Sequence, residues 1–217
     1  DTNAGNNVSG PVAITIACSG GCRITGGGHI DGITDPATMA DIGSAHFGGQ
    51  VGAPCGCIGC FDEFGHIQGN WQHDRKAHNG TLHAKSYNSL VCALDQGAGP
   101  DHPIVNANKA CFSGVADYNP TNGKKTILVA FRVEVEDRGE PGKDDRYRMR
   151  VWIPSSTETS DDLAREACCT NAAPVGRTPN FDDDGQLVGG NIQIHPALRK
   201  STEGQCPVPR GACFPTP

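Results

Sequence analysis

The sequence is poor in methionine, in charged residues and in long apolar runs. Of its 217 residues, 2 are Met and 19% are charged. No apolar run approaches the roughly 20 residues that a membrane-spanning helix needs. The net charge is −6, and Lys and Arg are scattered, so the clustered positive charge that binds nucleic acids or anionic membranes is missing. We therefore expect no nucleic-acid partner and no membrane span.

The motifs of familiar catalytic sites are also missing. The chain has no H-E-x-x-H, no G-x-S-x-G, no C-x-x-C-H and no phosphate-binding glycine loop. A glycosidase carboxylate pair has no sequence signature of its own, and 24 acidic residues leave room for one. We predict no catalytic residue, and the sequence favours a non-enzymatic role.

Cysteine, by contrast, is abundant. Eleven cysteines in 217 residues are typical of a disulfide-bonded exported protein, because cytosolic thiols stay reduced. We therefore expect a secreted or cell-surface protein. Eleven is an odd number, so at least one thiol is free, bound to another group or linked to a second chain. The cysteines are Cys18, Cys22, Cys55, Cys57, Cys60, Cys92, Cys111, Cys168, Cys169, Cys206 and Cys213.

Their spacing leaves the pairing open. Cys18 with Cys22, and Cys206 with Cys213, are close enough in sequence to pair locally. The adjacent residues Cys168 and Cys169 cannot easily bond to each other, so we expect each to reach a different partner.

The segment Cys55-Gly56-Cys57-Ile58-Gly59-Cys60 allows two interpretations. Three thiolates and His66 have the donor types of a zinc site, but an oxidising compartment favours a disulfide knot. A metal-dependent secreted enzyme would combine these cysteines with histidines. The histidines concerned, His73, His78 and His83, recur in steps of five, which match no single face of a helix or a strand.

The clearest local pattern is a β-hairpin over residues 131–152. Phe131, Val133 and Val135 alternate with polar residues, and Tyr147 begins a second alternating arm. With Val135 opposite Tyr147, glutamates face arginines on the solvent side: Glu134 lies opposite Arg148, and Glu136 opposite Arg146.

Further strands and one helix are predicted along the chain. The strand candidates are 12–17, 46–51, 65–72, 81–93, 109–116 and 186–194, and glycine or proline separates most of them. Gly26-Gly27-Gly28 is read as a bend. The one predicted helix covers 161–168, with Ser160 as its N-cap. We expect an all-β fold: an antiparallel, disulfide-stapled β-sandwich at 45–199 with an insert at about 154–186.

Both ends of the chain are expected to lie outside this sandwich. Residues 1–44 are predicted to form an extended N-terminal arm, and residues 200–217 an irregular, Cys- and Pro-rich tail. Within the arm, Val12, Ile14 and Ile16 could add a strand to the sheet of a neighbouring copy.

The hairpin turn supplies candidate calcium ligands. Asp137, Glu140, Asp144 and Asp145 lie within nine residues, and hard carboxylate oxygens suit calcium. A solvated turn tip is the competing interpretation, because turns collect Asp and Gly for backbone reasons. Asp182 and Asp184, in the stretch Asn180-Phe181-Asp182-Asp183-Asp184-Gly185, are weaker candidates, since position twelve of that stretch is Asn191 rather than glutamate.

Five motifs together resemble a known family. They are Phe47-Gly48-Gly49-Gln50-Val51, Gly69-Asn70-Trp71-Gln72-His73, Ala110-Cys111-Phe112-Ser113-Gly114, the turn Asp137-Arg138-Gly139-Glu140-Pro141-Gly142, and Gly189-Gly190-Asn191-Ile192-Gln193-Ile194-His195. Over about residues 45–196 the chain resembles the secreted bacterial β-sandwich modules called post-COAP, found after choice-of-anchor regions. The resemblance implies a surface β module, without an established activity and without catalytic residues to carry over.

Two functional hypotheses follow, besides the metal enzyme. The sequence favours a self-assembling extracellular subunit of a filament, sheath or surface layer, built by strand addition and disulfides, so that the main partner is the chain itself. The alternative is a calcium-stabilised binding or adhesion module whose partner is a glycan or a surface protein.

Overall fold

The computed structural model describes residues 22–34, 41–53, 67–75, 80–93, 107–120, 125–169, 176 and 178–196. The elements are β1 (Cys22–Thr34), β2 (Asp41–Gly52), β3 (Gln68–Arg75), β4 (Gly80–Ala93), β5 (Lys109–Pro120), β6 (Ile127–Glu136), β7 (Arg146–Trp152), α1 (Ser160–Glu166) and β8 (Phe181–Pro196).

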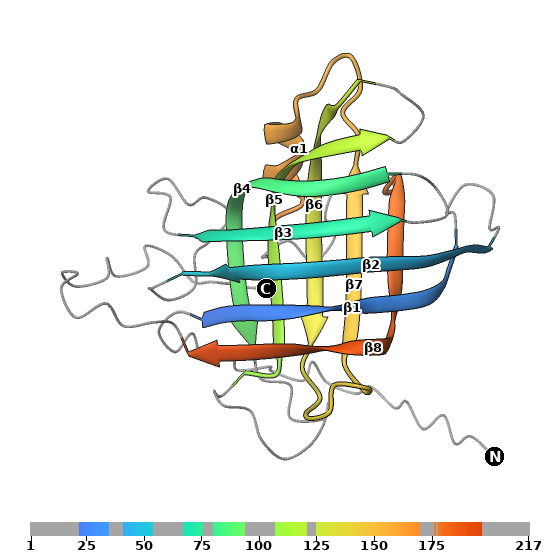
Figure 1. Cartoon of the computed structure of the whole chain (residues 1–217). Coiled ribbons are helices and arrows are strands. Elements are labelled where there is room, and N and C mark those ends of the chain that lie inside the picture. The colour runs from blue at the N-terminus through green and yellow to red at the C-terminus, as the bar shows by residue number, and fades with distance from the viewer. Residues whose placement is uncertain are drawn as a thin grey trace, which may run out of the picture.

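The eight strands form a closed antiparallel barrel in chain order, with β1 paired to β8. The all-β expectation is confirmed, but the sandwich is wrong in detail because the first and last strands join the two sheets. Figure 1 shows β1, β2 and β3 crossing in front of β5, β6 and β7, while β4 and β8 bend from one layer into the other. Register shifts in β4 accompany its bend. We call the layer of β1, β2, β3, the start of β4 and the end of β8 the front sheet.

Close backbone approach explains why β1 is a strand despite its glycine run. Gly28 pairs with Gly190 of β8. A Cβ on Gly28 would overlap the carbonyl oxygen of Gly189, and one on Gly190, whose φ is 114°, would overlap that of Gly27. The barrel therefore starts at Cys22, inside the range 1–44 that the sequence assigns to an arm.

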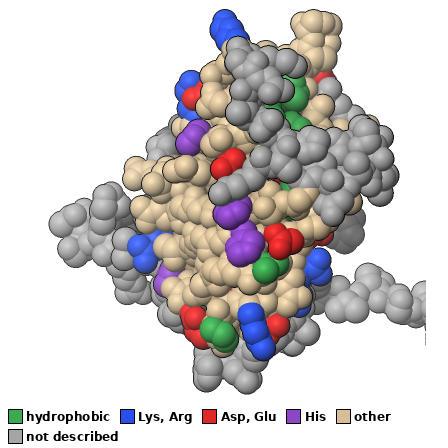
Figure 2. Space-filling model, turned by 45° about the vertical axis from the view of Figure 1, so that its right-hand side comes forward, with side chains coloured by type: hydrophobic (Ala, Val, Ile, Leu, Met, Phe, Trp, Pro, Cys, Tyr) green, Lys and Arg blue, Asp and Glu red, His purple; other side chains and the backbone are tan. Residues whose placement is uncertain are grey.

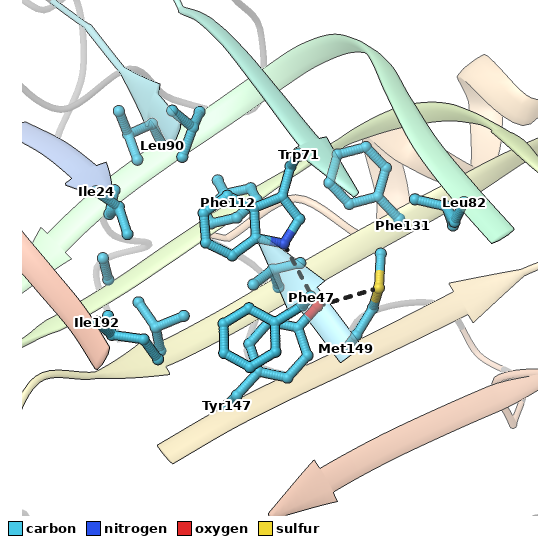
Figure 3. Close-up of a cluster of buried hydrophobic side chains, with 14 of the residues drawn as sticks. Ile24, Phe47, Trp71, Leu82, Leu90, Phe112, Phe131, Tyr147, Met149 and Ile192 are labelled. Atoms are coloured by element: carbon cyan, nitrogen blue, oxygen red, sulfur yellow. Dashed lines mark hydrogen bonds between the residues drawn. The ribbon is translucent and has the colours of Figure 1, made fainter. Parts of the chain in front are cut away.

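Aromatic side chains fill the barrel interior. Phe47 stacks on Tyr147 with 3.8 Å between ring centroids, and Trp71 meets Phe112 edge to face at 5.0 Å. Figure 3 shows these rings converging from β2, β3, β5 and β7. Eight-stranded barrels of this width are filled by side chains or hold one small ligand.

The hairpin of β6 and β7 has the predicted register, with Val135 opposite Tyr147 and Glu136 opposite Arg146. The ion pairs run differently from the prediction. Arg148 pairs with Asp182 of β8 at 2.7 Å, and Glu134 pairs with Arg150 at 2.7 Å. The neighbouring strand β8 supplies carboxylates that local pairing could not reveal.

Helix α1 covers the outer surface of β5 and β6. It begins one residue earlier than predicted, because the N-cap is Thr159 and not Ser160: the Thr159 hydroxyl accepts from Asp162 N at 3.1 Å. Leu163 and Ala164 pack on Trp152 and Val115 in a second, smaller apolar cluster. This side of the barrel is therefore covered.

Two disulfides join distant parts of the described chain. Cys22 bonds to Cys92 rather than locally, and Cys111 bonds to Cys169. Cys168 is also disulfide-bonded, so the adjacent pair reaches different partners as predicted. The described helix is far too short and polar to cross a membrane.

Candidate functional site

The acidic turn between β6 and β7 is a hydrogen-bonded clasp on β8. Asp145 accepts from Ile192 N at 2.8 Å and from Arg138 N at 2.8 Å. Asp137 accepts from Ile194 N at 3.0 Å. The two most specific motifs of the family resemblance, the turn and the last strand, are thus bound to each other.

The remaining turn carboxylates also act as acceptors. Glu140 accepts from the amides of Asn191 and Gln193 at 2.9 and 2.6 Å, and these hydrogen bonds lower the pKa of Glu140. Asp144 accepts from Gln186 at 3.2 Å. Within the described ranges, no three His, Cys, Asp or Glu side chains come together to hold a metal ion. The four predicted calcium ligands are neighbours in the turn, but the structure directs them to amide donors.

The second candidate calcium segment is the start of a strand, so its aspartates alternate between two faces. Asp182 and Asp184 point outward to Arg148 and Arg146. Asp183 points into the barrel. The predicted pair therefore forms ion pairs, and the residue between them, which the sequence reasoning passed over, enters the core.

Asp183 heads a buried polar network. His73 Nε2 donates to Asp183 Oδ2 at 2.8 Å, and Arg75 Nε donates to the same oxygen at 2.8 Å. In its neutral form His73 then accepts at Nδ1 from the Tyr147 hydroxyl, 3.2 Å away. Figure 3 shows the Tyr147 hydroxyl between Trp71, which donates to it, and Met149. Burial raises the pKa of Tyr147, so the hydroxyl stays protonated.

The charged end of this network lies near one end of the barrel. The Arg75 guanidinium lies 4.2 Å above the Phe181 ring. Arg75 and Asp183 are both buried, with side-chain exposures of 4% and 1%. Arg75 Nη2 and Asp183 Oδ1 lack a hydrogen-bond partner in the part of the chain that the structure describes. This ion pair joins β3 of the front sheet to the start of β8, which lies in the other layer.

The other predicted site residues do not converge. His73 is buried inside the barrel, whereas His83 is exposed on its outside. His66, His78, the cysteines Cys18, Cys55, Cys57, Cys60, Cys206 and Cys213, and the assembly residues Val12, Ile14 and Ile16 lie outside the described residues.

No element of the described chain packs on the outer surface of the front sheet, and this surface is polar. Pairing registers place its outward residues in rows across the strands. One row is Gln193, Thr25, Gln50 and Asn70; the next is Asn191, Gly27, Gly48, Gln72 and His83; a third contains His29, His46 and Asp74. We call these three rows the front-sheet face. The rings of His29 and His46 stack at 5.2 Å.

Two glycines at the centre of this face are not required by the barrel. A Cβ on Gly27 would come no closer than 3.5 Å to another atom, and one on Gly48 no closer than 3.7 Å, both ordinary contacts. Their neighbour Gly49, by contrast, has a φ of 148° and backs directly onto Asn70 O. Gly27 and Gly48 therefore leave the backbone open to close approach from outside.

Figure 2 shows part of this region: uncharged polar side chains and backbone dominate, histidines gather on it, and acidic and hydrophobic side chains lie beside the histidines. Apart from Asp74 in the histidine row, the three rows contain no Asp, Glu, Lys or Arg, and none contains an aliphatic or benzenoid side chain. Of the two exposed large apolar residues of the described chain, Leu128 lies on β6, while Val188 precedes Gly189, the partner of His29, and so borders the third row.

No family model, curated protein or solved structure matches the chain. The front-sheet face is the candidate functional site. Sequence reasoning missed it because its residues come from five separate strands, and only their registers bring them together.

Proposed function

We propose that the protein is an extracellular binding module that acts through the front-sheet face. The supporting observation is the contrast between the two sides of the barrel. The side formed by β5 and β6 is covered by α1, whereas no described element packs on the front sheet, which carries two glycines that the fold does not need. The disulfides are compatible with an extracellular environment. The family resemblance, which implies a surface module, points to the same class.

Self-assembly by strand addition stays a prediction. In the closed barrel every described strand pairs on both sides, so a donated strand would have no continuous free edge to join. Calcium stabilisation also stays a prediction, and the carboxylates of the turn already have N–H partners.

The proposal is tested by retention of the secreted protein on the surface of the cell that makes it. Gly48→Lys places a long cationic side chain on the face without a backbone clash, and we expect it to release most of the protein into the wash. Leu128→Lys, which adds the same charge at an exposed position of β6 away from the front-sheet face, is the matched control and should stay bound. Unchanged melting of both variants would show that they fold. Equal retention of wild type and Gly48→Lys would overturn the proposal.

A further inference from the structure

The composition of the front-sheet face restricts what can bind there. The core of a stable protein interface is apolar, and a lipid surface requires apolar side chains to insert. The three rows of the face have no aliphatic or benzenoid side chain. A partner that matches this face must therefore be polar throughout.

Charge restricts the partner further. Asp74 is the one formally charged residue of the three rows at neutral pH, and it lies between His46 of β2 and Thr81 of β4. Binding to an anionic polymer draws on several cationic side chains. The three rows supply none, the carboxylate of Glu140 lies against Asn191 and Gln193, and the neighbouring row carries one cation, Arg23. Charge complementarity therefore disfavours an anionic partner and favours a neutral one.

The functional groups on the face suit hydroxyl groups. Gln50, Asn70 and Gln72 are exposed, and no hydrogen bond ties their side chains to another described residue. A carboxamide both donates and accepts, as a sugar hydroxyl does. The open backbone at Gly27 and Gly48 lets a ring approach the sheet between these amides and the stacked imidazoles of His29 and His46.

Trp71, Phe47 and Phe112 are inside the barrel, and Trp152 packs under α1, so the described residues of the three rows offer no indole or phenyl platform for a single sugar ring. Individual contacts are then weak, and useful affinity requires that several sugars of one chain bind neighbouring rows together. A long chain fits this requirement better than a free disaccharide.

We propose that the front-sheet face binds a neutral polysaccharide, laid across the rows of amide and glycine positions; this inference rests on the function proposed above. Binding is expected to be insensitive to salt, because few charges are involved. A soluble disaccharide at millimolar concentration is expected to compete poorly.

The test is co-sedimentation of the purified full chain with insoluble cellulose, chitin and β-1,3-glucan, and with alginate beads as the anionic comparison. At least one neutral polymer should retain the protein equally at low and high salt, and alginate should not. Gln72→Ala and Asn70→Ala should each weaken binding about three- to ten-fold, the range expected for one lost hydrogen bond. Leu128→Lys should bind like wild type.

The outcomes separate this inference from the function on which it rests. The polysaccharide inference would be overturned if none of the three neutral polymers bound the protein. It would also be overturned if alginate retained the protein at low salt and released it at high salt. If Gly48→Lys still loses cell-surface retention in that case, the face remains the binding surface and its partner is of another class. If Gly48→Lys binds both cells and polymers like wild type, both proposals fail.

Discussion

Two neighbouring aspartates of β8 have opposite environments. Asp183 lies in the barrel with the buried cation of Arg75, while Asp184 forms an exposed pair with Arg146 at 3.5 Å, in which the two side chains are 41% and 46% exposed. Water screens the charges of the outer pair. The charged groups of the inner pair have lost their water contacts and interact with each other and, through Asp183, with His73. Chemically identical side chains one residue apart therefore contribute differently to stability.

Substitution of each aspartate by asparagine tests this difference. Asp183→Asn leaves the Arg75 cation buried without its counter-ion, and we expect the free energy of unfolding to fall by about 3–5 kcal/mol. Asp184→Asn is the matched control, with an expected loss under about 1 kcal/mol. Urea denaturation of both variants measures the two losses. Equal losses would contradict the assigned role of the buried pair.

At the scale of elements, the turn of residues 137–145 is held to β8 by its carboxylates. Asp145 is buried, and this burial raises its pKa from the ordinary 3.8 to about 6, although the N–H groups of Arg138 and Ile192 oppose the shift. The charges of Asp137 and Glu140 raise it further. The native protein therefore binds a proton at this turn more readily than the unfolded chain does.

This pKa predicts the direction of a pH effect. A raised native pKa gives stability that is fully present below about pH 4 and is lost as the pH rises through about 6. The free energy of unfolding of wild type, relative to Asp145→Asn, should thus increase as the pH falls from 7 to 5. Urea titrations of both proteins at the two pH values measure this difference, in which the titrating groups that do not interact with Asp145 cancel. A difference that shrinks toward pH 5 would contradict the prediction.

The elements with alternating side chains were predictable from sequence, and those built on glycine were not. The register of β6 and β7 follows from period-two alternation. The strand β1 was missed because Gly26, Gly27 and Gly28 have no side chains to alternate, and its strand character comes from contact with β8. Barrel closure was missed for the same reason.

The polar sites show a similar division. The acidic turn was found, but its role differs, because the N–H donors of Ile192 and Ile194 are some fifty residues away in sequence and give no local signal. The position of Asp183 had a readable signal: between Phe181 and Leu187 it falls on the inward phase of a strand. Reading that stretch as a calcium loop hid this alternation.

At the scale of the whole molecule, the disulfides join regions that no hydrogen-bonded ladder connects. Cys22–Cys92 links the start of β1 to the end of β4, across the two layers at one end of the barrel. Cys111–Cys169 ties the segment after α1 to β5. The first bond therefore links two strands of the barrel, and the second fixes the segment that follows α1 to the barrel.

Removing the bonds separately should separate these roles. The double variant Cys22→Ser with Cys92→Ser should lose roughly 2–4 kcal/mol of stability and show faster hydrogen exchange in β1 and β8. Cys111→Ser with Cys169→Ser should raise exchange mainly in α1. Hydrogen exchange followed by mass spectrometry measures both effects. Faster exchange in β1 from the second variant alone would contradict the assignment.

The pairing of the first described strand with the last has a kinetic consequence. Cys22 lies beside Pro196, so the ladder that closes the barrel joins residues from nearly opposite ends of the described chain. Contacts so distant in sequence form late and slowly, because a long loop must be closed before they contribute free energy. During synthesis β1 has no partner on its β8 side until β8 has been made. Its backbone N–H and C=O groups on that side form an unpaired edge for that time. Because β1 is rich in glycine and has few apolar side chains, its unpaired edge is less prone to aggregate before β8 pairs with it.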